Sequence, residues 1–282
     1  MDLVQFEKEK EALHIDDMVN QSIELISKKN FDNVLKILKP LTLQFEHGEK
    51  LENTEDIEFY SFTDNIEFFT KLIENASTGK TTNISALNPN YGRMYHLLGY
   101  VYSELNDIDH AVTSLEKALK WNPVSAGTYL EYAEIYKKNA DWDKFLPLAQ
   151  NALKYAKTAL TLARAYRGLG YYYCEQKNYN LSVALYMHSL QFEENREIVG
   201  TEVGYMYEQS KKTLNLPNPD DAVKIILENN LDVEMSNYVF AGYTKFLSAL
   251  KEAGETQAYS YYEEIVKKLI FSPDKIEYLK SI

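Results

Sequence analysis

The sequence predicts an all-α fold in which short helical hairpins stack one after another along the chain. Three observations carry this prediction. Four tyrosines recur at intervals of 34, 37 and 34 residues: Tyr102, Tyr136, Tyr173 and Tyr207. Gly170 and Gly204 are also 34 residues apart. Between these markers, apolar residues recur every three or four positions and turn-forming residues separate the runs, as expected for paired helices that need neighbours to bury their apolar faces.

The clearest unit spans residues 92–125. An apolar helical stripe over 94–105 ends at the turn-forming residues 106–109, and a second apolar stripe follows them. The unit has one pattern: Tyr95-x2-Leu98-Gly99-x2-Tyr102, then Ala111-x3-Leu115-x2-Ala118, then Pro123. This pattern resembles the tetratricopeptide repeat. The resemblance implies a right-handed α-α superhelix of such hairpins, in which small residues such as Gly99 let the two helices of a hairpin approach closely.

The resemblance is clear over about 92–230 and gives four repeats, over 92–125, 126–159, 163–196 and 197–230. The second repeat is weaker, because Ala133 replaces the glycine and Phe145 occupies a position that is usually small. In the fourth repeat, Ala222 begins the pattern of the second helix six residues later than expected, after a loop that contains prolines.

The resemblance is looser at both ends of the chain. Three regions are expected: a helical N-terminal cap over 1–90, the repeats over 91–235, and a C-terminal helical hairpin with a capping tail over 236–282. The cap contains a degenerate repeat over 15–40, whose second helix is expected to end before Pro40. An apolar-rich helix is expected over 56–76 and a polar loop over 77–90. The C-terminal hairpin is expected to turn at residues 252–255.

The composition is that of an ordinary globular protein, with 45% hydrophobic and 26% charged residues. The formal net charge of −12 argues against nucleic-acid binding, because phosphate contacts need a basic surface. No apolar run approaches the length of a membrane span, and the first residues lack the apolar segment of a signal peptide. The single cysteine, Cys174, cannot form an internal disulfide, which fits a reducing compartment. These observations predict a cytoplasmic protein without membrane insertion.

Three segments carry residue types that catalytic or metal sites use, and each has a simpler interpretation. Gly79-Lys80-Thr81 resembles the end of a phosphate-binding loop, but Glu74 stands where that motif needs its first glycine, so a polar loop is favoured. Residues 107–110, Asp-Ile-Asp-His, occupy a turn in which such residues begin helices. Cys174 has no nearby histidine in the sequence to act as a base, which favours a structural thiol. The sequence therefore predicts no catalytic residue, no metal, no cofactor and no enzymatic activity.

The resemblance also implies where a partner binds, since the first helices of such repeats line a concave groove. Eight residues at groove positions are candidates for peptide binding: Arg93, His96, Tyr100, Lys137, Arg164, Arg167, Tyr171 and Tyr205. Tyr100, Tyr171 and Tyr205 share one repeat position and would form an exposed aromatic ladder, and the arginines offer paired hydrogen bonds to a carboxylate. The alternative is that the tyrosines pack between repeats and the arginines balance local acids. The carboxylate clamp that holds chaperone tails in this family is not reproduced.

The leading hypothesis is a non-enzymatic protein–protein interaction module, or scaffold, that binds a peptide segment of a partner in the groove. An acidic group on that protein or peptide would suit the arginines. An alternative is a bacterial peptide-sensing regulator in which the repeats bind a signalling peptide, although residues 1–90 lack a basic recognition helix. A third class is a hydrolase or transferase that uses Cys174. A homo-oligomer is compatible with the sequence.

Overall fold

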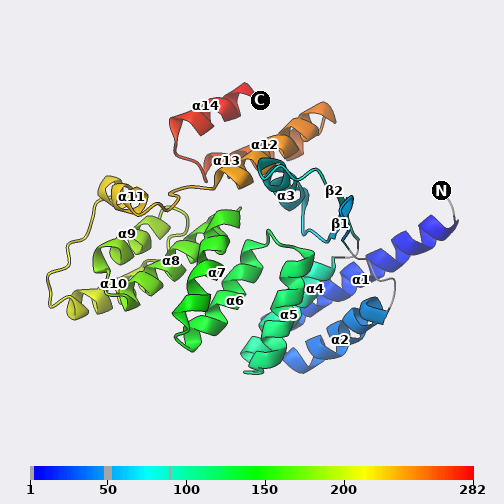
Figure 1. The fold of residues 1–282 in the computed structure, drawn as a ribbon, viewed down its shortest axis with the longest axis horizontal. Helices are drawn as coiled ribbons and strands as arrows, with labels where there is room; N and C mark the ends of the chain where they lie inside the picture. Colours follow the sequence, from blue (N-terminus) through cyan, green and yellow to red (C-terminus); the bar gives the residue numbers. More distant parts are fainter. Residues whose placement is uncertain (1–2, 48–52, 89) are drawn as a thin grey trace. The chain divides into compact units, whose positions relative to one another are not determined.

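The computed structural model describes residues 3–47, 53–88 and 90–282, and nearly all of the regular structure in these ranges is helical (Figure 1). The chain divides into two compact units, unit 1 (residues 1–135) and unit 2 (residues 136–282). Within each unit, many helices that follow one another in the sequence pack side by side. The prediction of an all-α fold of stacked helical hairpins is therefore confirmed.

The described part of unit 1 begins with a helical hairpin and continues with the elements that surround the candidate site. Its elements are α1 (Leu3–Ser27), α2 (Phe31–His47), β1 (Ile57–Tyr60), α3 (Asn65–Ser77), β2 (Asn83–Ala86), α4 (Tyr91–Glu104), α5 (Ile108–Trp121) and the greater part of α6 (Ala126–Lys138). Helices α1 and α2 pack together and bury Val34 and Leu38 completely. The expectation that the second of these helices ends before Pro40 is wrong, because Pro40 lies inside α2. Pro40 is exposed, so water can satisfy the carbonyl that its missing N–H leaves unpaired.

Helices α4 and α5 form the hairpin that the sequence pattern predicts most clearly. Asp107 begins α5, because its side chain accepts the backbone N–H of His110, and Asn106 before it has a left-handed backbone (φ 59°) that ends α4. The helices approach closely at Gly99, where a Cβ atom would lie 2.5 Å from Cγ of the fully buried Leu115. The predicted role of this glycine in helix packing is confirmed.

The prediction of a helix over 56–76 is wrong for its first residues. Residues 57–60 form the strand β1, which pairs in parallel with β2, so that Ile57 lies opposite Asn83 and Tyr60 opposite Ala86. Helix α3 begins only at Asn65, because the side chain of Asp64 accepts the backbone N–H of Glu67 at 3.1 Å and caps the helix there. The expected loop over 77–90 contains the second strand. This β–α–β segment lies directly before α4 in the chain and helps to shape the cleft described below.

Unit 2 contains the remaining helices. They are α7 (Trp142–Tyr155), α8 (Ala159–Glu175), α9 (Tyr179–Ser189), α10 (Arg196–Gln209), α11 (Pro219–Glu228), α12 (Asn237–Glu252), α13 (Thr256–Lys267) and α14 (Pro273–Ser281). Helix α8 packs against α7 on one side and α9 on the other. At Gly170, a Cβ atom would lie 2.9 Å from two ring carbons of Tyr186, so this glycine also gives a close helix approach, as predicted. Tyr166, Leu169 and Leu185 are fully buried between these helices.

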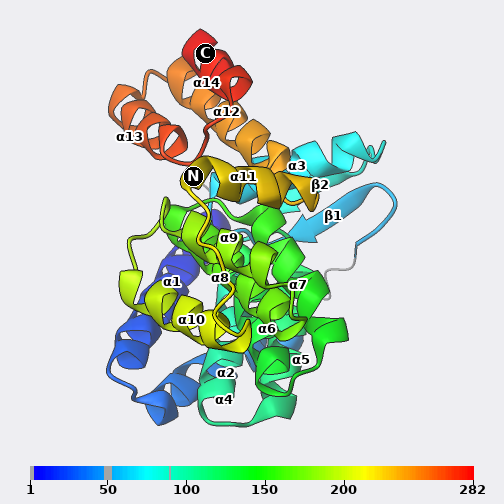
Figure 2. The same ribbon diagram turned by 90° about the vertical axis from the view of Figure 1, so that its left-hand side faces the viewer.

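The two helices of the predicted fourth repeat have a common neighbour. Both α10 and α11 pack against α9, and α11 makes the more extensive contact (Figure 2). The second helix that the pattern predicts is present as α11, and Ala222 and Ile226 are buried on it. Residues 210–218, which include Pro217, lead the chain from α10 to this position on α9.

The helices predicted over 236–270 are present as α12 and α13, which pack together. They turn at Gly254, whose left-handed backbone (φ 74°) suits glycine. Helix α14 follows and is fixed by Glu234, a buried carboxylate before α12. Glu234 accepts the backbone N–H groups of Phe271 and Ser272 and forms an ion pair of 2.9 Å with Lys275 on α14.

Candidate functional site

A cleft of about 400 Å³ lies in unit 1 beside Arg93, the first of the candidate residues from the sequence. It is bounded by α1, by the start of α3, by the start of α4 and by the residues between β2 and α4. Four asparagines line it: Asn20, Asn65, Asn88 and Asn90. Phe62 and Phe68 add apolar surface, and Asp16 and Asp64 add two carboxylates. The cleft therefore offers a cation, several amide groups and aromatic rings within one small space.

Arg93 is held in place through its backbone. The side chain of Asn90 accepts the backbone N–H of Arg93 at 2.9 Å and caps α4, while its amide donates to the carbonyl of Phe62 at 3.0 Å. Among the described residues, the Arg93 guanidinium makes no hydrogen bond and no ion pair. A half-buried arginine whose five donors meet no acceptor in the described ranges can bind an acceptor from another molecule.

His96 and Tyr100, the other candidates in unit 1, lie further along α4. The Nδ1 atom of His96 is 3.1 Å from the hydroxyl oxygen of Thr128, at the start of α6. Both His96 and Tyr100 are half-buried and have interaction partners. In unit 1, Arg93 is therefore the candidate that faces the cleft.

Arg167 and Arg164 are the candidate arginines of unit 2, and both lie on α8. Arg167 forms an ion pair with Glu193, at 2.6 Å between Nη2 and Oε2, and only 12% of its side chain is exposed. Its Nη1 atom is buried without a hydrogen-bond partner in the described structure. Arg164 is half-buried and also has a partner. The charge of Arg167 is thus neutralised within the protein.

Tyr171, Tyr205 and Lys137 form an aromatic and charged group on unit 2. The Nζ atom of Lys137 lies 4.4 Å from the ring centre of Tyr171, a cation–π contact. Tyr171 also packs against the buried cluster that includes Cys174, while Tyr205 on α10 is 49% exposed. Burial raises the pKa of Tyr171, and the negative charges of Glu175 and Glu202 raise it further. The surroundings of this aromatic pair are acidic.

Residues 92–125 match the family model for the tetratricopeptide repeat, over the interval that α4 and α5 occupy. The chain contains a tetratricopeptide repeat. A comparison with curated protein sequences gives no match. Tetratricopeptide repeats mediate protein–protein interactions, so the match supports an interaction module in general terms. Arg93 is the second residue of the matched repeat and lies on the first turn of its first helix, where α4 borders the cleft.

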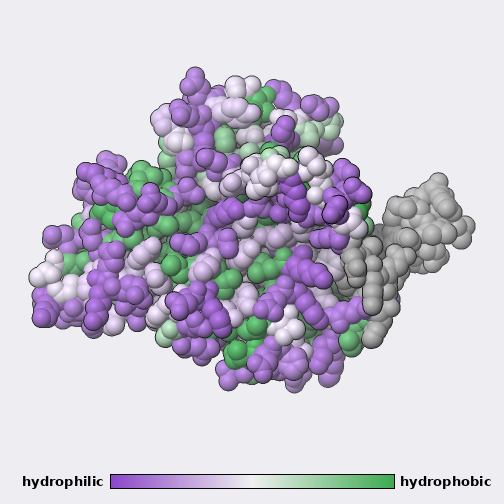
Figure 3. All heavy atoms as spheres, viewed as in Figure 1, coloured by the Kyte–Doolittle hydropathy of each residue, from purple (hydrophilic) through white to green (hydrophobic). Residues whose placement is uncertain are grey.

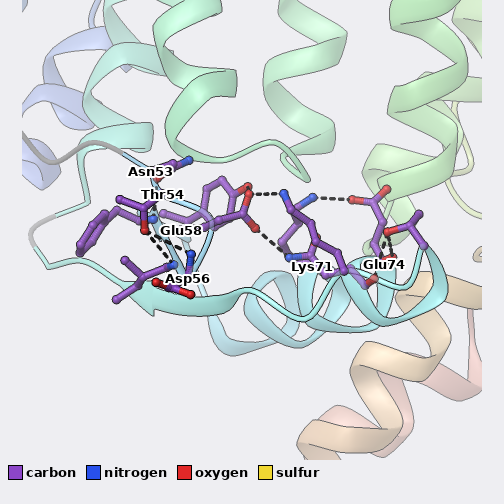
Figure 4. Close-up of polar contacts among 12 residues, drawn as sticks. Asn53, Thr54, Asp56, Glu58, Lys71 and Glu74 are labelled. Atoms are coloured by element: carbon purple, nitrogen blue, oxygen red, sulfur yellow. Dashed lines mark hydrogen bonds and ion pairs between the residues drawn. The ribbon is translucent and has the colours of Figure 1, made fainter.

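The Gly79-Lys80-Thr81 segment, just before this repeat, has a structural role. Lys80 forms an ion pair and hydrogen bond with Glu58 on β1, and Asn75 donates to the same carboxylate at 2.8 Å. Burial alone would raise the pKa of Glu58, but hydrogen bonds from Lys80, Asn75 and Tyr60 hold it below its usual range. Figure 4 shows Glu58 on the strand side of this network and the Lys71–Glu74 ion pair on the helix side. The lysine therefore stabilises the β–α–β segment.

Cys174 has the environment of a structural thiol. It is 4% exposed and belongs to a cluster with Val183, Tyr186 and Met206. Burial raises the pKa of the thiol to about 11, and the nearby charges of Glu175 and Glu202 act in the same direction. At neutral pH the thiol is protonated, which is the unreactive form.

The described ranges contain no group of three or more His, Cys, Asp or Glu side chains placed to hold a metal ion. Within the same ranges, no helix combines the length and the apolar character needed to cross a membrane. Hydrophilic residues cover much of the face seen in Figure 3, with apolar residues in small areas between them.

The asparagines of the cleft are site residues that the sequence pattern missed. They come from α1, from the start of α3 and from the residues before α4, which are separated by up to 70 positions, from Asn20 to Asn90. Only Asn90 carries a local signal, because an asparagine before an apolar helical stripe is typical of a helix cap. The others are brought together by tertiary packing.

Proposed function

We propose that this protein is an interaction module that binds a peptide segment of a partner protein, and that the cleft beside Arg93 receives an acidic group of that peptide. The observation that carries the proposal is the half-buried Arg93 guanidinium, which has no partner among the described residues. Arginine binds carboxylates through two parallel charge-assisted hydrogen bonds, which are about twice as strong as neutral ones. An acidic side chain or a C-terminal carboxylate fits this chemistry.

Two helix N-termini favour the same kind of ligand. Helices α3 and α4 both begin at the cleft, and the N-terminus of a helix attracts negative charge, because the aligned peptide dipoles of the helix place partial positive charge there. The start of α3 is already capped by the charged Asp64, whereas the start of α4 is capped by the neutral Asn90. An incoming carboxylate is therefore favoured at the Arg93 side of the cleft.

The asparagines supply the part of recognition that concerns the peptide backbone. Each asparagine side chain both donates and accepts hydrogen bonds, which matches the N–H and C=O groups of an extended peptide. Asp16 is available for a donor on the same ligand, and Phe62 and Phe68 provide apolar contact. The ligand class is thus a peptide with one acidic group, and a simple anion would use only part of the cleft.

The candidates of unit 2 are considered apart from the Arg93 cleft. Because Glu193 neutralises Arg167, we assign the reading of the acidic group to Arg93. Within unit 2, Tyr171 and Tyr205 offer rigid contact area with polar tips. Lys137, which lies over the ring of Tyr171, fixes the position of that ring.

The test is selection of peptides from a random 12-residue library displayed on phage, followed by fluorescence anisotropy with the selected peptides. We expect them to share an acidic residue, and we expect Arg93→Gln to weaken their binding by about ten-fold or more. Arg196→Gln is the matched control, because Arg196 is an exposed arginine whose removal should leave the affinity unchanged. Selected peptides without an acidic residue, or with equal affinity for Arg93→Gln and the wild type, would contradict the proposal.

A further inference from the structure

Helix α10 carries the packing face of a hairpin, but no second helix in the described part of the chain covers that face. In α8, Gly170 lies against α9, and a Cβ atom there would be 2.9 Å from the ring of Tyr186. Gly99 lies against α5 in the same manner, with Leu115 at 2.5 Å. Gly204 follows Gly170 by one repeat length of 34 residues, and a Cβ atom at Gly204 would meet no atom within 4 Å.

Neighbouring positions on α10 show the same difference. A Cβ atom at Gly200, one turn before Gly204, would also meet nothing within 4 Å. Tyr207 is the counterpart of Tyr173 by repeat position and is 42% exposed. Val203 is only half-buried, whereas its counterpart Leu169 is fully buried in the α8–α9 hairpin. Val203 packs against the buried cluster around Cys174, so it borders the uncovered surface without belonging to it. We define the open face of α10 by Gly200, Gly204 and Tyr207.

The open face exists because the next helix in the chain packs elsewhere. Helix α11 lies on α9 (Figure 2), and its residues Ala222 and Ile226 are buried. The two glycines of α10 leave space for another helix to approach as closely as α9 approaches α8. A helix is therefore the element that fits this face, with an apolar side chain to cover Tyr207.

The charge beside the open face indicates which kind of helix would bind there. Glu197 and Glu208 are exposed and lie along one edge of the face, since a helix places positions three, four, seven and eight residues apart on one side. Arg196 lies on the same side of α10, and its charge is paired with Glu194 at 2.8 Å. Glu208 has only a long, exposed contact of 3.8 Å with Lys212, and Glu197 has no ion pair among the described residues. A second copy of this chain would bring another formal charge of −12 toward these acids, which disfavours self-association here.

We propose that the open face of α10 binds a basic amphipathic helix of a partner protein, which takes the place of a hairpin's second helix. The apolar side of that helix would pack on the glycines and Tyr207, and its lysines or arginines would pair with Glu197 and Glu208. This site lies within unit 2 and is independent of the Arg93 cleft in unit 1, so either proposal can fail without the other.

The probe for the test is a synthetic helical peptide that copies the apolar positions of α9 and has lysine at its remaining positions. A matched peptide carries glutamate in place of each lysine. Binding is measured by fluorescence anisotropy with the full chain. We expect the lysine peptide to bind at least about ten-fold more tightly than the glutamate peptide. We expect the Glu197→Lys, Glu208→Lys double variant to remove this preference, whereas Glu228→Lys, an exposed charge reversal on α11, should keep it.

A glycine substitution separates the open face from general charge attraction. Gly204→Leu should block the lysine peptide while leaving the protein folded, since nothing lies within 4 Å of the new Cβ atom. Tyr207→Ala should weaken binding, and Tyr261→Ala, which removes an exposed tyrosine from α13, should not. The Arg93→Gln variant should bind the lysine peptide with the same affinity as the wild type.

Several results would overturn the proposal. They are equal affinity for the two peptides, no binding of the lysine peptide up to its solubility limit, or unchanged binding by Gly204→Leu with its fold intact by circular dichroism. A dimer in sedimentation equilibrium that Gly204→Leu dissociates would also overturn it, because the occupant of the face would then be a second copy of the chain.

Discussion

Two alanine substitutions in unit 2, Gly170→Ala and Gly204→Ala, should change stability in different directions, although both glycines have the same repeat position. At Gly170 the new Cβ atom would lie 2.9 Å from two ring carbons of Tyr186. That distance is at least about 0.6 Å shorter than the roughly 3.5–4.0 Å at which two carbon atoms attract each other. The ring has little room to retreat, because Tyr186 is 2% exposed and belongs to the cluster around Cys174. The backbone is held as well, since the hydroxyl of Ser182 donates to the Gly170 carbonyl at 2.6 Å.

The expected magnitudes follow from these contacts. Overpacking of a core contact costs about 1–3 kcal/mol. Replacement of glycine by alanine inside a helix stabilises the helix by about 1 kcal/mol, because alanine has the higher helix propensity. Gly170→Ala should therefore lower the free energy of unfolding by about 0–2 kcal/mol, while Gly204→Ala, whose Cβ atom meets nothing within 4 Å, should raise it by about 1 kcal/mol.

The assay is urea unfolding followed by far-ultraviolet circular dichroism, with both variants and the wild type measured side by side. Because the two glycines lie in the same unit, any separate unfolding of unit 1 affects both variants equally. The reasoning is refuted if Gly204→Ala destabilises the protein as much as Gly170→Ala, which would mean that the face of α10 is covered in solution. Stabilisation by both variants would show that Tyr186 accommodates a methyl group.

Three further predictions concern buried ionisable groups. Burial raises the pKa of the Cys174 thiol to about 11, so a disulfide reagent should leave the folded protein unlabelled at neutral pH. The same reagent should label the protein rapidly when urea unfolds it. Rapid labelling of the folded protein would contradict this prediction. The pKa of Glu58 is lower in the folded protein than the reference value of 4.5, so its contribution to stability is present above that pH and is lost as the pH falls through the folded pKa. Glu58→Gln should therefore make the unfolding free energy less sensitive to acid, and an unchanged pH profile would argue against the network around it. Glu234→Ala removes the acceptor of two backbone N–H groups, those of Phe271 and Ser272, and should cost about 1–3 kcal/mol, with faster hydrogen exchange in α14 than in a Glu228→Ala control.

The local elements that the sequence predicts well are those whose signals lie within one hairpin. Gly99 and the cap Asp107 are examples, because each acts on residues less than one repeat away. The strand β1 could not be predicted in this way. Its residues Ile57 and Tyr60 also fit an apolar helical stripe, and its partner β2 lies in a polar segment 26 positions later, at Asn83 opposite Ile57. Strand pairing of this kind depends on tertiary structure more than on local preference.

Only the part of the candidate site whose signal lies within one repeat was predictable from the sequence. Arg93 is found from the sequence because it sits at the start of a clear repeat and is one of only four arginines. The asparagines Asn20 and Asn65, which complete the cleft, have no sequence relation to it. Helix α11 gives a similar case. The positions of Ala222 and Ile226 predict a helix, but they do not indicate that this helix packs against α9.

Both proposed binding surfaces arise where the chain departs from the repeat pattern. In unit 1, the β–α–β segment before α4 replaces a regular hairpin and forms much of the cleft beside Arg93. In unit 2, the loop over 210–218 carries α11 away from α10 and leaves Gly204 uncovered. A regular array of hairpins buries each such face against the next helix, so it leaves only its groove and its ends for partners. An irregular array has additional unfilled positions, and a partner that supplies the missing element gains burial that the chain itself does not use. Variants of Arg93 and Gly204 therefore test two separate consequences of one structural cause.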